Sequence, residues 1–278
     1  MTTEQQVAEQ YRHGALERAI LNALAASGKD VERLTRRDLG SADEYHLGSH
    51  AATAGLASDL GLASGMRVLD VGAGIGGPAR YFAEAHGCVV HGIDLSDEYV
   101  RVANALTRRC GLAETVSFGQ ASALAIPFAD RSFDCATLIH VGMNLADKAK
   151  AFAEVRRVLR PGGVFGVYDV MLTGDGEIAY PMPWAITAAA SFLETLAAYR
   201  ALLAAEGFAI EKERNWRETA LQLGRKMRER SAQHGAPPLG LHILMGPSTP
   251  QRIANVISAL EDDMIAPIEI VARALYCP

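Results

Sequence analysis

The segment VLDVGAGIGGPAR, residues 68–80, constrains the fold more than any other part of the chain. Its glycines have the spacing Gly72-x-Gly74-x-x-Gly77 directly after a short apolar run. This spacing is typical of a strand, a nucleotide-binding turn and the start of a helix. Asp70 lies inside the apolar run. Because a buried carboxylate needs donors or a positive partner to offset its desolvation, Asp70 limits which ligands the turn can serve.

Apolar runs of strand length alternate with helix-like runs from residue 66 onwards. Seven runs are interpreted as strands: 68–71, 89–93, 115–118, 135–139, 164–170, 208–212 and 268–275. Ser96 has the side chain of a helix N-cap just after the second of them. Strands that alternate with helices of this length favour parallel βαβ crossovers. We therefore expect an α/β fold with a doubly wound, seven-stranded, mostly parallel sheet.

The pattern along the chain predicts four segments. Residues 4–26 are expected to form one amphipathic helix, because apolar side chains recur at Leu16, Ile20 and Leu24. Helical signals also fill the stretch between the sixth and seventh strands. The expected segments are an N-terminal helical lid (1–60), a cofactor-binding core (61–214), an inserted helical cap (215–263) and the last core strand (264–278).

Composition excludes several classes of protein. The 278 residues carry a net charge of −5, whereas nucleic-acid proteins usually need a basic excess. No apolar run approaches membrane-spanning length. The four cysteines show no CxxC or Cys/His ligand spacing, so no metal is expected. The polar N-terminus has no secretory signal pattern, and we expect a cytoplasmic protein.

Asp94 ends the second predicted strand, at the edge of the sheet where ligands of open α/β folds bind. A carboxylate there can accept hydrogen bonds from ribose hydroxyls, which suits either a dinucleotide or S-adenosylmethionine. Asp70 favours the second ligand, because a pyrophosphate is anionic whereas S-adenosylmethionine carries an ammonium and a sulfonium. An NAD(P)-dependent oxidoreductase stays open as the alternative, as does a protein that binds S-adenosylmethionine without turnover.

Four segments, VLDVGAGIGG, GIDLS, IPFADRSFD and EVRRVLRPGG, occur in this order and resemble successive motifs of the class I S-adenosylmethionine-dependent methyltransferases. YHLGSH upstream of the core and the helical insert resemble the small-molecule branch. That branch includes sarcosine/dimethylglycine N-methyltransferases and quinone or natural-product C- and O-methyltransferases. The resemblance implies a Rossmann-like methyltransferase fold, S-adenosylmethionine as cofactor with S-adenosylhomocysteine as product, and methyl transfer to an N, O or C atom of a small molecule.

The resemblance also implies cofactor-binding residues. Asp70 would support the turn and the methionine ammonium, the backbone of Gly72, Ala73 and Gly74 would cradle the cofactor, and Asp94 would bind the ribose. Ser122 stands where the family usually has an aspartate for the adenine amino group, so it offers a neutral and weaker acceptor. The remaining expected contacts are Leu95 against the adenine, Ala123 and His140.

Candidates for acceptor chemistry cluster near the end of the fourth strand. His140 ends that strand and could act as a general base, or only shape the pocket. Asn144 could orient an acceptor, and Tyr45 could face the sulfonium. Six further residues are expected to contact the substrate: Tyr11, His46, Met143, Tyr180, Trp184 and Trp216. The expected partners are a small-molecule acceptor and, through the apolar N-terminal helix, a second copy in a homodimer, with no nucleic acid or membrane.

Overall fold

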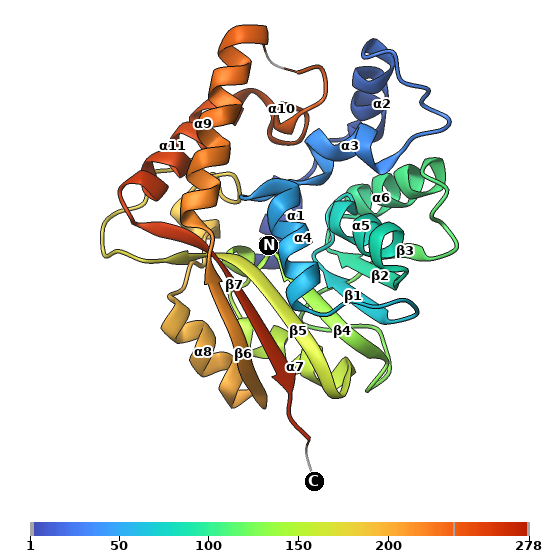
Figure 1. Cartoon of the computed structure of the whole chain (residues 1–278). Helices are drawn as coiled ribbons and strands as arrows, with labels where there is room; N and C mark the ends of the chain where they lie inside the picture. Colours follow the sequence, from blue (N-terminus) through green and yellow to red (C-terminus); the bar gives the residue numbers. More distant parts are fainter. Residues whose placement is uncertain (1–2, 236, 277–278) are drawn as a thin grey trace.

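The computed structural model describes residues 3–235 and 237–276. Within these residues seven strands form one sheet in the order β3-β2-β1-β4-β5-β7-β6, at the centre of the molecule (Figure 1). The strands are β1 (Arg67–Val71), β2 (Val89–Asp94), β3 (Val116–Gln120), β4 (Phe133–Ile139), β5 (Leu159–Leu172), β6 (Phe208–Asn215) and β7 (Ile265–Ala274). Of these, β7 alone runs antiparallel to its neighbours. The predicted seven-stranded, mostly parallel α/β sheet is confirmed.

Helices cover both faces of the sheet, because its central strands bury apolar side chains on both sides. One core joins β1 and β2 to α4 (Ser49–Asp59) and α5 (Gly77–His86), and α6 (Asp97–Arg109) packs on β2 and β3. The opposite core joins the sheet to α7 (Lys148–Val158) and α8 (Leu196–Ala205). Ser96 caps α6 as predicted, accepting the N–H of Tyr99 at 3.2 Å.

The N-terminal region forms two helices, so the prediction of one helix over residues 4–26 is wrong. Gly14, at φ +82°, lies in the break between α1 (Thr3–Gln10) and α2 (Leu16–Ala26). The Glu98 carboxylate accepts the backbone N–H groups of residues 13, 14 and 16. These hydrogen bonds stabilise the break, because the first N–H groups of a helix have no partner within it. The predicted apolar face of α2 is buried at Leu16, Ile20 and Leu24.

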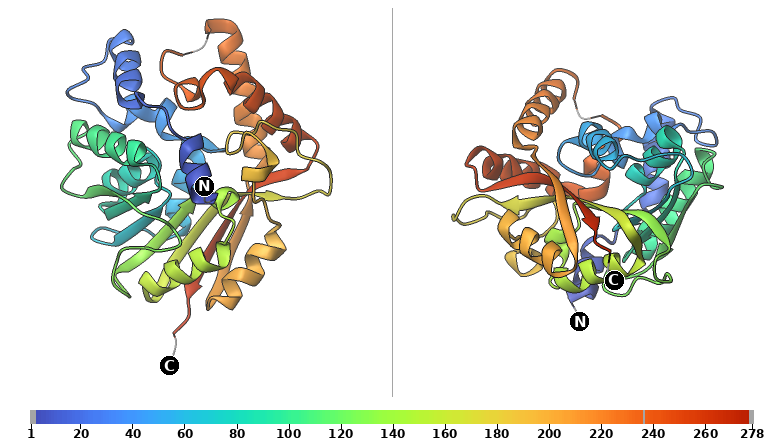
Figure 2. Two further views of the ribbon diagram at one scale, coloured as in Figure 1. Left: turned by 180° about the vertical axis from the view of Figure 1, so that it is seen from behind. Right: turned by 60° about the horizontal axis from the view of Figure 1, so that its bottom comes forward.

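Three helices lie between β6 and β7 in the sequence: α9 (Arg217–His234), α10 (Leu241–Met245) and α11 (Thr249–Glu261). They lie on the same side of the molecule as α2 and α3 (Arg36–Asp43), as Figures 1 and 2 show. Short 3-10 helices occur at η1 (Gly142–Asn144), η2 (Ala188–Ala190) and η3 (Gly246–Ser248). The division into lid, core, cap and last strand stays a prediction, and residues 1–2, 236 and 277–278 of it lie outside the described residues.

The glycine turn between β1 and α5 is fixed by close packing. Gly72 has φ +71°, and a Cβ added there would lie 2.3 Å from Cγ2 of Val141. A Cβ on Gly77 would lie 2.1 Å from the carbonyl oxygen of Asp43, at the end of α3. Both glycines are therefore required for space. This packing joins the turn to the end of β4 and to the N-terminal helices.

Candidate functional site

One large cavity, about 1450 Å³, lies at the carboxyl ends of β1, β2 and β4. It extends from the glycine turn to the helices between β6 and β7, and the N-terminal helices close another side. Pockets in α/β sheets form at this edge. Most of the predicted site residues line it: Tyr11, Tyr45, His46, Asp70, Gly72, Ala73, Gly74, Asp94, Leu95, Ala123, His140, Met143, Asn144 and Trp184.

Asp70 places a carboxyl group with one free oxygen beside the cavity. The side chain is buried, and its Oδ1 accepts the hydroxyl of Thr137, on β4, at 2.8 Å. Its Oδ2 is buried with no hydrogen-bond partner among the described residues. Burial raises the pKa of Asp70 to about 7, and the Thr137 hydrogen bond opposes this shift. A positively charged ligand would give Oδ2 its missing partner and favour the ionised carboxylate.

The turn and Asp94 form a single hydrogen-bonded unit. The N–H groups of Gly72 and Ala73 both donate to the carbonyl of Ile93, at 2.8 and 2.9 Å. Oδ2 of Asp94 accepts the N–H of Gly74 at 2.9 Å, and Oδ1 accepts the N–H of Ser96 at 2.8 Å. Each carboxylate oxygen retains a further lone pair. Asp94 is thus held rigidly and can still accept hydrogen bonds from a ligand.

Ser122 does not line the cavity, although Ala121 and Ala123 on either side of it do. Its hydroxyl donates to the Glu4 carboxylate of α1 and accepts the N–H of Leu124 at 2.9 Å. The expected adenine contact of Ser122 is therefore not supported by this arrangement. Glu4 competes with the adenine for the same hydroxyl. Because Glu4 and Ser122 are 118 residues apart in the sequence, no local pattern predicts their hydrogen bond.

His140 follows the last residue of β4 in a strained backbone conformation, at φ +53°. Its N–H donates to the carbonyl of Tyr168 at 2.7 Å. The ring lies 5.2 Å from the Tyr168 ring and 5.6 Å from the His46 ring, measured between centroids. Its Nε2 is buried with no partner among the described residues. Burial and the nearby His46 hold the pKa of His140 well below its ordinary value, so the ring is neutral at pH 7.

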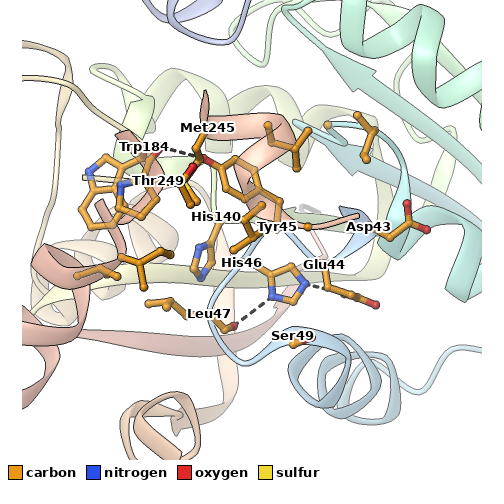
Figure 3. A pocket seen from close by; sticks show the side chains of 18 of the residues that line it. Asp43, Glu44, Tyr45, His46, Leu47, Ser49, His140, Trp184, Met245 and Thr249 are labelled. Atoms are coloured by element: carbon orange, nitrogen blue, oxygen red, sulfur yellow. Dashed lines mark hydrogen bonds and ion pairs between the residues drawn. The ribbon is translucent and has the colours of Figure 1, made fainter. Parts of the chain in front are cut away.

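Tyr45 and His46 both line the cavity, but their polar atoms have partners within the protein. The Tyr45 hydroxyl donates to the carbonyl of Pro183 at 2.9 Å. His46 Nε2 lies 2.9 Å from Oε2 of Glu44, and Figure 3 shows the His46 ring between Glu44 and His140. Sequence analysis missed Glu44, because it has no motif of its own and only the fold reveals its burial.

Tyr11 and Asn144 connect α1 to the loop after β4. The Tyr11 hydroxyl donates to Oδ1 of Asn144 at 2.9 Å. The Asn144 amide donates to the carbonyls of Trp184 and Ala190, at 2.8 and 3.3 Å. Both Asn144 donors are therefore engaged, and this side chain holds a wall of the cavity together. Burial raises the pKa of Tyr11 well above its ordinary value.

Two predicted substrate residues lie outside the cavity lining. Tyr180 packs beside the apolar cluster that contains Met182 and Trp184. Trp216 is buried against α4, where it leaves room only for a glycine at position 55, and its indole N–H donates to Glu269 at 3.0 Å. Trp216 is buried in the core, whereas Tyr180 is partly exposed. Their assignment as substrate contacts stays a prediction. Met143 and Trp184 do line it, as expected.

The far part of the cavity is lined mostly by apolar side chains of the three helices between β6 and β7, together with charged and polar ones such as Arg228, His242 and Glu261. The apolar residues include Leu223 and Met227 of α9, Leu241, Leu244 and Met245 of α10, and Ile253 and Ile257 of α11. The residues described contain no group of three or more His, Cys, Asp or Glu placed to hold a metal ion. None of the helices within 3–235 and 237–276 is long and apolar enough to cross a bilayer.

The central part of this chain is similar in sequence to known methyltransferases. Residues 69–167 match the methyltransferase domain family. Sterol 24-C-methyltransferase ERG6B of Gibberella zeae is 38% identical over 118 residues, 42% of this chain and 31% of the relative. Methyltransferase GfsG of Streptomyces halstedii is 36% identical over 137 residues, 49% of each chain. The chain thus spans about a third to a half of the length of these curated relatives.

Solved structures resemble the chain over nearly its whole length. The [4+2]-cyclase SpnF is 25% identical with a TM-score of 0.71, over 99% of this chain and 98% of that one. Geranyl diphosphate C-methyltransferase from Streptomyces coelicolor is 16% identical with a TM-score of 0.71, over 99% of both chains. The chain has the Rossmann-like methyltransferase fold, and its residues 69–167 match the methyltransferase domain family.

Proposed function

We propose that this protein is an S-adenosylmethionine-dependent methyltransferase that acts on a bulky, largely apolar small molecule. The observation that carries the proposal is the continuity of one cavity, from the unpaired oxygen of Asp70 to the apolar chamber beside His140. The cofactor end offers carboxylates without a basic side chain for a pyrophosphate. The acceptor end offers apolar walls and a neutral imidazole.

The residues present fit the cofactor. Asp70 Oδ2 lacks a partner and would bind the methionine ammonium, while Asp94 would accept the ribose hydroxyls and Leu95 would lie against the adenine. Bound S-adenosylmethionine supplies a methyl group already activated by its sulfonium. The chain must then orient the acceptor in line with that methyl, exclude water and take up any proton that the acceptor loses. We assign that role to the neutral ring of His140, which lines the cavity.

Two observations support a bulky apolar acceptor. The cavity of about 1450 Å³ has room for an acceptor beside the cofactor, and most of its lining is apolar. Two of the matched relatives are named as sterol 24-C-methyltransferases. A compact polar acceptor would leave the apolar chamber between α9 and α11 unfilled.

Transfer of a tritiated methyl group tests the proposal. The protein is incubated with S-[methyl-³H]adenosylmethionine and either an organic-solvent extract or an aqueous extract of cells. We expect label in compounds recovered from the organic extract. Label in neither extract, despite saturable binding of S-adenosylhomocysteine, would favour a protein that binds the cofactor without methyl transfer. The solved structure titled as a [4+2]-cyclase makes this control necessary. Binding of NAD in place of S-adenosylhomocysteine would revive the oxidoreductase alternative.

We further propose a cytoplasmic location and a homodimer, with no nucleic-acid partner. Free thiols at Cys88, Cys110 and Cys135 are consistent with a reducing compartment. The net charge of −5 disfavours binding to phosphate backbones. Sedimentation velocity tests the dimer. Salt-dependent retention on a nucleic-acid column would contradict the proposal that the protein has no nucleic-acid partner.

A further inference from the structure

The segment between α3 and α4 carries a buried acid and a buried imidazole that neither cofactor nor acceptor binding requires. Glu44 is 7% exposed, and the side chain of His46 is 3% exposed. The two groups lie 2.9 Å apart, Nε2 to Oε2. Burying a charge is unfavourable unless it is paired and hydrogen-bonded, so the protonation state of this pair needs an explanation.

The hydrogen bonds around His46 Nε2 require a proton on that nitrogen. The Thr53 hydroxyl donates to Oε2 of Glu44 at 2.8 Å, which uses its only proton. Thr53 Oγ1 is also 3.0 Å from His46 Nε2, so it can only accept there. The carboxylate, the other neighbour of Nε2, is an acceptor as well.

The second ring nitrogen also faces an acceptor. His46 Nδ1 lies 3.1 Å from the carbonyl oxygen of Leu47, a contact drawn in Figure 3. The Tyr168 hydroxyl donates to the same carbonyl at 2.6 Å. A histidine whose two nitrogens both face acceptors is satisfied when both carry protons, that is, as an imidazolium. Although burial acts in the opposite direction, the hydrogen bond and charge of His46 hold the pKa of Glu44 below its ordinary value.

We propose that Glu44 and His46 form a buried ion pair whose positive ring keeps the neighbouring His140 neutral. His46 is thus a positioning residue that acts through His140, instead of the substrate contact expected from sequence. The ring-to-ring distance of 5.6 Å lets a positive His46 disfavour a second positive charge. The other titratable groups near His140 are Tyr168 on β5 and, across the same cavity, Tyr45 and Asp70.

The role in catalysis rests on the proposed function, but the charge states can be measured without any acceptor. Histidine-selective ¹⁵N NMR of the full chain reports how many protons each ring carries, with His140→Gln used to assign the His140 signals. In the wild type at pH 7 we expect two ring protons on His46 and one on His140. A His46 ring with one proton at pH 7 would overturn the proposal by itself.

Glu44→Gln retains the shape and the acceptor oxygen but removes the negative charge. We expect His46 to lose its second proton and the apparent pKa of His140 to rise by about one to two pH units. That is the effect of a unit charge at this distance with an effective dielectric constant of about 20–40. His46→Gln should raise the His140 pKa similarly, which provides a second test if Glu44→Gln does not fold.

The matched control is His50→Gln, because His50 is half exposed and lies 3.5 Å from the other oxygen of Glu44. It should leave both ring signals unchanged. Calorimetry with S-adenosylhomocysteine on each variant separates this proposal from the proposed function. If the wild type does not bind S-adenosylhomocysteine, the proposed function is contradicted. If the His140 pKa is unchanged in both Glu44→Gln and His46→Gln, the ion pair is contradicted.

Discussion

Ionisation of the buried carboxyl group of Asp70 lowers the stability of the ligand-free protein, although the ionised form is the one that would bind a positively charged ligand. Burial raises its pKa to about 7, from an unfolded value of about 3.9. Between these pH values the native chain binds a proton that the unfolded chain has released. The free energy of unfolding therefore falls as the pH rises, by about 1.4 kcal/mol per unit. The total loss, complete above pH 7, is about 4 kcal/mol.

Asp70→Asn removes this titration and nearly keeps the shape. The amide oxygen can still accept from Thr137, but the amide nitrogen takes the position of Oδ2, where no partner exists. That unsatisfied group costs about 1–3 kcal/mol at any pH. We expect Asp70→Asn to be less stable than the wild type by this amount at pH 4, and more stable by about 1–3 kcal/mol at pH 8.

Urea denaturation at the two pH values measures the effect in the protein without ligand. Subtracting the free energy of unfolding of the variant from that of the wild type cancels the contribution of other titrating groups. Asp97→Asn is the control, because Asp97 is exposed at the start of α6, where it pairs with Arg101. It should lower the free energy of unfolding by about 0.5–1.5 kcal/mol at pH 8 and give no gain in stability there. The same stability difference for Asp70→Asn at pH 4 and pH 8 would refute the burial argument.

Two further substitutions test the packing that supports the site. Gly72→Ala would place Cβ 2.3 Å from Val141 and should lower the free energy of unfolding by about 2–4 kcal/mol in urea denaturation. The control Gly74→Ala meets nothing within 4 Å and should cost about 1–2 kcal/mol; equal losses would contradict the steric argument. Arg80→Met leaves Asp43 without the guanidinium that contacts it at 2.5 Å, which should cost about 3–5 kcal/mol. A loss below about 1 kcal/mol would show that this pair is not needed.

The sheet and the cofactor end of the site could be predicted because their signals are local. Asp70, the glycine spacing and Asp94 lie within 25 residues of sequence, at the ends of two adjacent strands. Strand polarity then brings them to one edge. The backbone geometry at Gly72 follows from the same short segment.

The acceptor end depends on contacts between distant segments, which no local pattern reveals. Ser122 was expected to face the cofactor, but Glu4 of α1 takes its hydroxyl. Trp216 was expected in the cavity, yet its indole fills the space beside Gly55 of α4. Glu44 gave no signal, because its importance comes only from burial beside His46.

The break in the N-terminal helix has the same kind of cause. The apolar spacing of α2 predicts a helix correctly, but periodicity alone does not mark where the preceding helix ends. A carboxylate on α6, that of Glu98, supplies hydrogen bonds to the N–H groups at the start of α2. Tertiary contacts of this kind override a continuous helical pattern.

Calorimetric titration with S-adenosylhomocysteine at pH 8 tests the central claim most directly, that the Asp70 carboxylate forms the binding site for a cationic nucleoside. We expect one site per chain in the wild type. In Asp70→Asn the affinity should fall by at least about 30-fold, since breaking a buried charge pair costs 2–5 kcal/mol or more. Absence of binding by the wild type, or equal affinities of the two proteins, would contradict the account.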